Sequence, residues 1–298
     1  MRQDYHDLLK PELVKSVSGL ALISRVIVDG FLSGLNHSRR VGPGMEFSQY
    51  RSYQSGDDLR LLDWKMLARS GRYYIKQSEI ETNISIKFIL DSSKSMSHEE
   101  DGLSKMDFAR ILVASLAYLA QSQGDAVGLF ALNDHRLHSI YPKVQKQHFN
   151  RLLLELTNIE NEGKWPTNPM ASRKLHDRTH KELIFFITDM YEDNQELSQF
   201  VKRLKTLRNE VVVLHIMGGH EMDFEYKGNV TFEDLETGSK LKVNAVEAKK
   251  QYLKSLNAMI SRTKDLLLAN DISYHLFRLD DHMGEALQLF LKKRSNLL

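Results

Sequence analysis

Aspartate and hydroxyl side chains follow directly after an apolar run near residue 90. Asp91, Ser93 and Ser95 stand at alternate positions behind the β-branched and aromatic segment 84–90. A second apolar run, at 182–188, ends at an aspartate, residue 189. Carboxylate and hydroxyl oxygens are hard ligands that suit Mg²⁺, Mn²⁺ or Ca²⁺. The pattern indicates a metal site, with the capped N-terminus of a helix as the alternative for the first three residues.

The elements that would position these side chains alternate along the chain. From residue 82 onward, apolar strand patterns alternate with helical patterns, which predicts an α/β fold with a mainly parallel sheet flanked by helices. Two strand patterns around the turn 133–135 predict one antiparallel edge. Ligands bind such sheets outside the carboxyl ends of the strands. Asp91 and Asp189 therefore face one crevice if their strands are neighbours.

A further hydroxyl belongs to the same pattern. Thr167 lies in the loop before a predicted helix at 169–180 and can reach this sheet edge. The set resembles the metal-ion-dependent adhesion site of von Willebrand factor A domains, with the matching residues Asp91, Ser93, Ser95, Thr167 and Asp189. The resemblance implies that the serines and the threonine coordinate Mg²⁺, that the aspartates act directly or through water, and that a partner's carboxylate completes the octahedron. The chain departs from the pattern at Lys94, where many such domains have glycine, and in the Lys-Trp-Pro before the threonine.

A longer pattern precedes the sheet, in the segment "GPGMEFSQYRSYQSGDDLRLLDWKMLARSGRYYIKQSEIE". It resembles the signature of the bacterial family called domain of unknown function 58, and the resemblance extends from about residue 10 to the C-terminus. The family implies an accessory protein of a MoxR-type AAA+ ATPase, without known catalysis of its own. The signature is interpreted as a structural plug or as a docking surface, and its residues here are Glu46, Arg51, Asp57, Asp58, Arg60, Asp63, Trp64 and Arg69.

These patterns predict two parts of the chain. Residues 1–80 contain two helical patterns and the signature segment, and we expect them to pack on the main domain. Residues 81–298 form a von Willebrand factor A-like domain. A polar β-hairpin, at about 226–244, is inserted in it and turns at Thr237-Gly238. A long helix from 245 to about 269 follows the hairpin.

Composition excludes several classes of protein. The 298 residues carry 41 basic and 39 acidic side chains, a formal charge of +2, so a general nucleic-acid footprint is not supported. The absence of cysteine excludes disulfides, thiolate metal sites and cysteine nucleophiles. The most apolar segment, 19–35, contains Arg25 and Asp29 and is shorter than the roughly 20 apolar residues of a membrane span. With a polar N-terminus that lacks a signal core, the sequence predicts a cytoplasmic protein without a transmembrane segment.

The predicted function is that of a non-catalytic interaction module that captures an acidic loop of the ATPase or its client through Mg²⁺ (or Mn²⁺ or Ca²⁺). A Mg²⁺-dependent hydrolase is one alternative, although position 93 is serine where a nucleophilic aspartate would have a second carboxylate. A scaffold with a vestigial metal site is the other. The chain has no phosphate-binding Gly-x-x-x-x-Gly-Lys motif, so a partner must supply any ATP hydrolysis. His176 and His180 have the spacing of zinc ligands, but without a third ligand they indicate a solvated helix face.

Overall fold

The computed structural model describes residues 10–35, 47–53, 62–78, 84–166, 181–192 and 195–295. The chain forms two compact units. One unit is Ser33–Asn83, and the other combines Met1–Leu32 with Ile84–Leu298.

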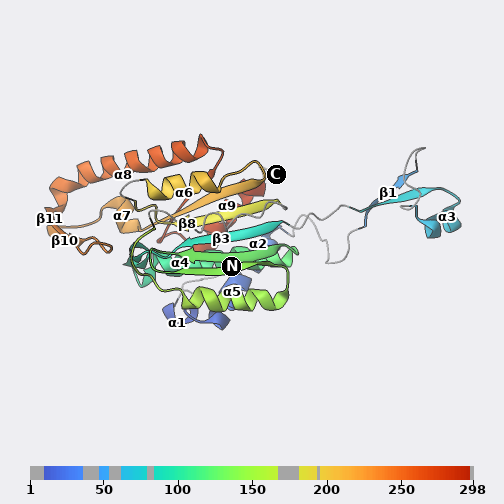
Figure 1. Cartoon of the computed structure of the whole chain (residues 1–298), viewed down its shortest axis with the longest axis horizontal. Helices are drawn as coiled ribbons and strands as arrows, with labels where there is room; N and C mark the ends of the chain where they lie inside the picture. Colours follow the sequence, from blue (N-terminus) through green and yellow to red (C-terminus); the bar gives the residue numbers. More distant parts are fainter. Residues whose placement is uncertain are drawn as a thin grey trace. The chain divides into compact units, whose positions relative to one another are not determined.

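The larger unit is built on a six-stranded sheet (Figure 1). All neighbouring strands are parallel except β6 and β7, which are antiparallel at one edge. This arrangement confirms the predicted α/β fold and its antiparallel edge. From one edge to the other the strands are β12 (Ser273–Arg278), β9 (Asn209–Met217), β8 (Glu182–Thr188), β3 (Ser85–Asp91), β6 (Ala126–Leu132) and β7 (Leu137–Lys143).

Helices cover both faces of this sheet, because the central strands are apolar on both sides. Phe88 and Leu90 of β3 belong to one core and Ile89 to the other, as alternation along a strand requires. Figure 1 shows α4 (Lys105–Ser122) and α5 (Lys146–Asn158) on one side of the sheet. The other side carries α6 (Glu196–Leu204) and α8 (Ala245–Leu268), while α9 (Met283–Ser295) adds apolar residues to the core beneath α4.

The N-terminal helices share the core beneath α4. Helix α1 (Pro11–Val14) is short, and α2 (Val17–Leu35) follows it after a break. Leu20, Ile23 and Ile27 of α2 are buried in the same cluster as the side chains of α4. Contacts thus group residues up to 32 with the sheet, whereas the sequence predicted one N-terminal part up to residue 80. The reason is that an amphipathic helix removes its apolar face from water only by joining a larger core.

The smaller unit contains part of the signature. Strand β1 (Phe47–Ser52) pairs with β2 (Tyr74–Ser78) in antiparallel fashion, and helix α3 (Trp64–Ser70) lies between them in the chain. Asp63 caps α3, because its carboxylate accepts hydrogen bonds from the backbone N–H groups of residues 65 and 66 at 2.9 and 3.0 Å. Gly71 ends the helix with a φ of 66°, a conformation that favours glycine.

The inserted hairpin has the predicted place. Strands β10 (Asn229–Glu233) and β11 (Lys240–Asn244) pair in antiparallel fashion, and Gly238 in the turn has a φ of 71°. Three short elements were not predicted, namely the pair β4 (Glu99–Glu100) and β5 (Leu103–Ser104) and helix α7 (Gly219–Asp223). Within the described ranges, no helix combines the length and the apolar character needed to cross a membrane.

Candidate metal centre

The two predicted aspartates lie at the ends of the two strands between which the strand order of the sheet reverses. Strand β3 lies between β6 and β8, and the chain continues from β3 to one side of the sheet and from β8 to the other. Open α/β sheets bind ligands outside the carboxyl ends of the strands at such a switch point. Asp91 is the last residue of β3, and Asp189 directly follows the last residue of β8.

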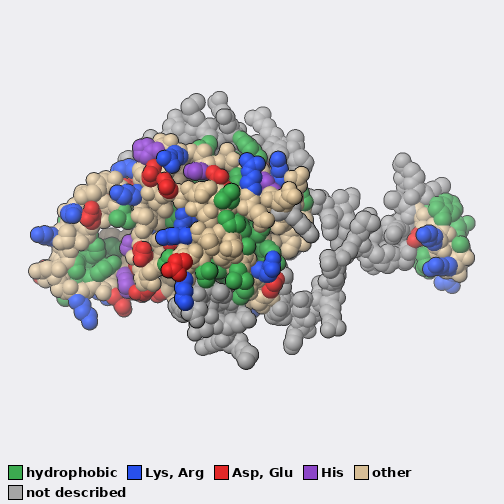
Figure 2. All heavy atoms as spheres, turned by 90° about the horizontal axis from the view of Figure 1, so that it is seen from below, with side chains coloured by type: hydrophobic (Ala, Val, Ile, Leu, Met, Phe, Trp, Pro, Cys, Tyr) green, Lys and Arg blue, Asp and Glu red, His purple; other side chains and the backbone are tan. Residues whose placement is uncertain are grey.

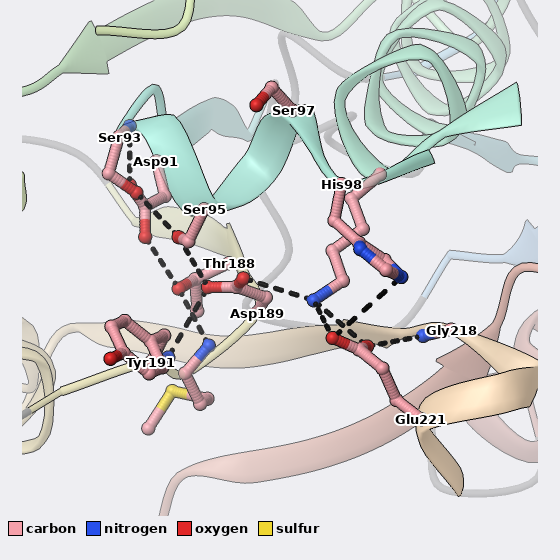
Figure 3. A network of polar contacts seen from close by, with 12 residues as sticks. Asp91, Ser93, Ser95, Ser97, His98, Thr188, Asp189, Tyr191, Gly218 and Glu221 are labelled. Carbon is pink, nitrogen blue, oxygen red and sulfur yellow. Dashed lines mark hydrogen bonds and ion pairs between the residues drawn. The ribbon is translucent and has the colours of Figure 1, made fainter. Parts of the chain in front are cut away.

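The loop after β3 brings two hydroxyls to the same place. A single helical turn, η3 (Lys94–Ser97), follows the strand and contains Ser95. The hydroxyl oxygens of Ser93 and Ser95 are 3.0 Å apart, and Ser95 donates a hydrogen bond to Asp189 Oδ1 at 3.2 Å. The backbone N–H of Ser93 donates to Asp91 Oδ1 at 3.0 Å. Figure 3 shows the four side chains turned toward one another, and all four are buried.

Thr188 is a member of this network that the sequence reasoning did not identify. Its hydroxyl donates a hydrogen bond to Asp91 Oδ2 at 2.8 Å and accepts one from the backbone N–H of Met190 at 3.0 Å. The residue is the last of β8 and is fully buried. A hydroxyl at the end of the otherwise apolar run 183–187 is the signal that could have identified it. Thr188 orients the Asp91 carboxylate.

The two carboxylates repel each other. Burial, followed by the negative charge of Asp189, raises the pKa of Asp91 to about 7. The hydrogen bonds from Ser93 and Thr188 oppose this effect without cancelling it. A site that holds an ionised carboxylate at this cost in free energy favours any cation that can enter it.

One built-in cation already contacts the site. Lys105, the first residue of α4, places its ammonium 3.2 Å from Asp189 Oδ2 and 3.0 Å from the carboxylate of Glu221. Burial would lower the pKa of Lys105, but the two carboxylates outweigh it and raise the pKa, so the side chain stays charged. The ammonium lies against one oxygen of Asp189, while the other faces Ser95.

A buried histidine holds the backbone of the second aspartate. His215 Nε2 donates a hydrogen bond to the backbone carbonyl of Asp189 at 2.9 Å, and the Tyr274 hydroxyl donates to His215 Nδ1 at 2.6 Å. Burial lowers the pKa of His215 to about 4, so the ring is neutral near pH 7. Both ring nitrogens are engaged, and the histidine acts as a support for the Asp189 loop.

The donor set fits a small hard cation. In an octahedron with Mg–O bonds of about 2.1 Å, neighbouring ligand oxygens lie about 3 Å apart. The Ser93–Ser95 and Ser95–Asp189 oxygen distances of 3.0 and 3.2 Å have this spacing. The Lys94 side chain is exposed. Thr167, the fifth expected ligand, lies outside the described residues, as do His176 and His180.

The four signature residues that the structure describes all belong to the smaller unit, Ser33–Asn83. Asp63 caps α3, as described above, and Arg69 is exposed in the last turn of that helix. Trp64 is 64% exposed, and Arg51 lies in β1. The other four expected residues lie outside the described part of the chain, namely Glu46, Asp57, Asp58 and Arg60. Among the signature residues described, only Asp63 has an evident structural role.

Residues 49–260 match the family described as protein of unknown function DUF58. The chain belongs to this family. It is also similar to two proteins called uncharacterized, Mb1516 of Mycobacterium bovis and Rv1480 of Mycobacterium tuberculosis. Each is 22% identical over 235 residues, which are 78% of this chain and 74% of the relative.

Similar solved structures include von Willebrand factor A domains. The conserved hypothetical protein BatB from Bacteroides thetaiotaomicron is 15% identical, with a TM-score of 0.44 over 72% of this chain and 99% of that one. A von Willebrand factor type A structure from Catenulispora acidiphila is 13% identical, with a TM-score of 0.37 over 70% and 42% of the two chains. The strand order described above, and not these similarities, establishes the mainly parallel sheet of this member of DUF58.

Proposed function

We propose that this chain is a metal-dependent protein-interaction module without catalytic activity of its own. Asp91, Ser93, Ser95 and Asp189 would hold Mg²⁺, or Mn²⁺ or Ca²⁺ in its place, and a carboxylate of a partner would complete the coordination. The observation that carries the proposal is the spacing of these oxygens, 3.0 and 3.2 Å at the switch point of the sheet. The bound ion would supply a positive charge that attracts an acidic side chain.

The composition of the donor set supports binding to an outside carboxylate. Two carboxylates match the charge of a divalent ion, while the hydroxyls of Ser93 and Ser95 add none. Hydroxyls are weak ligands, so the ion keeps much of its affinity for a further anionic oxygen. A site formed only by carboxylates would satisfy the ion and weaken its attraction for a partner.

The charge distribution favours a protein partner over a nucleic acid. The formal charge of the chain is +2, and Figure 2 shows acidic and basic side chains interspersed over the face that it presents. A nucleic-acid site needs a continuous basic patch or stripe. The partner proposed is a MoxR-type AAA+ ATPase or its client. This choice follows from the sequence resemblance, which implies the association; the family description itself names no partner.

Two basic groups near the site are not available as proton acceptors. His215 is neutral but has both ring nitrogens in hydrogen bonds, and Lys105 stays charged between Asp189 and Glu221. A metal-dependent hydrolase would need a base within reach of a metal-bound water. Neither His215 nor Lys105 can therefore act as that base.

Calorimetric titration of Mg²⁺ and Mn²⁺ into the metal-free protein tests the proposal. We expect saturable binding that Asp91→Ala abolishes. The control Glu160→Ala removes an exposed carboxylate that pairs with Arg136 at 3.5 Å, and it should bind as the unmodified protein does. Circular dichroism verifies that each variant is folded. Equal binding by Asp91→Ala would contradict the proposed site.

A pull-down with the cognate MoxR-type ATPase tests the partner. We expect capture in Mg²⁺ that both EDTA and Asp91→Ala abolish. If the protein binds no metal, either alone or with the ATPase, the remaining function is that of a scaffold with a vestigial metal site. Mg²⁺-dependent turnover of a generic phosphoester that Asp91→Asn abolishes would establish the hydrolase instead.

A further inference from the structure

The tip of the β10–β11 hairpin is held against the loop that carries Asp189. Asp234 organises the tip, because its carboxylate accepts hydrogen bonds from the backbone N–H of Glu236 at 2.9 Å and from the Thr237 hydroxyl at 2.6 Å. The same carboxylate accepts a hydrogen bond from the hydroxyl of Tyr191 at 3.1 Å. Tyr191 is two residues beyond Asp189 and donates its backbone N–H to Asp189 Oδ1 at 3.3 Å. The hairpin tip and the candidate metal centre are thus linked through one tyrosine.

The base of the hairpin is anchored by aromatic side chains. Phe224, before β10, packs on Tyr252 of α8 with ring centroids 4.6 Å apart. Tyr226 packs on Phe232 of β10 at 5.0 Å, with the rings nearly perpendicular. Such contacts restrict the hairpin to a defined position over the sheet edge. The hairpin is therefore held at its base by these aromatic contacts and at its tip by Tyr191.

This position brings a third carboxylate to the candidate metal centre. The Glu236 side chain is half-buried, and it interacts with the Ser95 hydroxyl and with the charges of Asp91 and Asp189. Lys105 neutralises one of the three carboxylates, Asp189, and the remaining negative charges of Asp91 and Glu236 favour a further cation beside Ser95.

We propose that Glu236 is an intramolecular ligand of the metal ion, and that it takes the coordination position that a partner's carboxylate would use. The hairpin then occupies the site at rest, and an acidic partner has to displace its tip. This inference rests on the proposed function, because it requires an ion at Asp91 and Asp189. It adds a ligand that lies outside the strand-end motif and that belongs to the inserted hairpin of this chain.

Mn²⁺ is the probe for the test, because its bound water molecules can be counted by water-proton relaxation. We expect Glu236→Ala to bind Mn²⁺ about tenfold more weakly than the unmodified protein. The ion bound to the variant should carry one more water molecule. The matched control is Glu233→Ala, which removes a carboxylate of the same hairpin that pairs with Lys240 at 3.1 Å. It should leave both the affinity and the water count unchanged.

Acetate, as the simplest carboxylate, then tests whether the position is shared. Acetate should displace water from Mn²⁺ in Glu236→Ala at concentrations that leave the unmodified protein unaffected. Hydrogen exchange provides a second readout, since Mn²⁺ should slow exchange in residues 229–244 of the unmodified protein and not in Glu236→Ala.

The outcomes separate this inference from the proposed function. Equal Mn²⁺ affinity, water count and hairpin exchange in Glu236→Ala and the unmodified protein would overturn the role of Glu236 while the metal site stands. Absence of Mn²⁺ binding in both proteins, with circular dichroism showing both to be folded, would overturn the two together. A variant that binds Mn²⁺ more tightly than the unmodified protein would identify Glu236 as a blocking group and not a ligand.

Discussion

The metal-free site should make the fold less stable, and Asp91→Asn should relieve this cost. The Asp91 carboxylate is buried and faces the charge of Asp189, which together raise its pKa from an ordinary 3.8 to about 7. That difference corresponds to roughly 4 kcal/mol between the folded and unfolded states when the carboxylate is ionised. Asparagine keeps the shape and an acceptor for the N–H of Ser93 but carries no charge. We expect the variant to be more stable by about 2–4 kcal/mol at pH 8 in EDTA.

The sign of the pH dependence follows from the same values. The folded state takes up a proton on Asp91 more readily than the unfolded chain does. The free energy by which this proton uptake stabilises the folded state is fully present below about pH 4 and is lost as the pH rises through about 7. The advantage of Asp91→Asn should therefore be large at pH 8 and less than half as large at pH 5. Mg²⁺ at about one hundred times its Kd should stabilise the unmodified protein by about 2.7 kcal/mol and leave the variant unchanged.

Urea denaturation in EDTA at pH 5 and pH 8 measures these differences. Asp107→Asn is the control, because Asp107 is an equally buried aspartate whose charge is paired with Arg110 at 2.7 Å. Removing that charge should destabilise the protein by about 3–5 kcal/mol. The same substitution thus has opposite effects at the two positions. The reasoning would be refuted if the Asp91→Asn variant were less stable than the unmodified protein at pH 8.

Three further predictions concern single side chains of the sheet domain. Lys105→Met should lower the stability of the metal-free protein by about 3 kcal/mol and tighten Mg²⁺ binding, because the ammonium no longer competes for Asp189; thermal melts with and without Mg²⁺ test both effects. Lys87 and Glu182 form a buried ion pair between β3 and β8. Lys87→Met alone should lower the free energy of unfolding by about 3–5 kcal/mol, because it leaves the Glu182 charge buried and unpaired. The double variant with Glu182→Leu should recover most of this loss in urea denaturation. Burial lowers the pKa of His148, so the protein should lose stability relative to His148→Gln as the pH falls from 7 to 5. The same difference in unfolding free energy between the two proteins at pH 7 and pH 5 would contradict this.

Several features of the fold could be predicted from short stretches of sequence. The apolar runs before Asp91 and Asp189 became β3 and β8, and the turn 133–135 lies between the antiparallel strands β6 and β7. The polar hairpin lies within the predicted range 226–244. These features depend on periodicity and on turn residues, which are local properties of the chain. The predicted ligands Asp91, Ser93, Ser95 and Asp189 follow from the same local rule that strand ends form the binding edge.

The remaining parts of the site required the tertiary structure. Strand order makes β3 and β8 neighbours, and only then does Thr188 reach Asp91. Lys105 contacts Glu221 across 116 residues of sequence, and the inserted hairpin brings Glu236 to Ser95 from about 140 residues further along the chain. No local pattern encodes such contacts, because they depend on which elements pack side by side. The sequence by itself determined which oxygens lie at the sheet edge, and the packing decided which charges surround them.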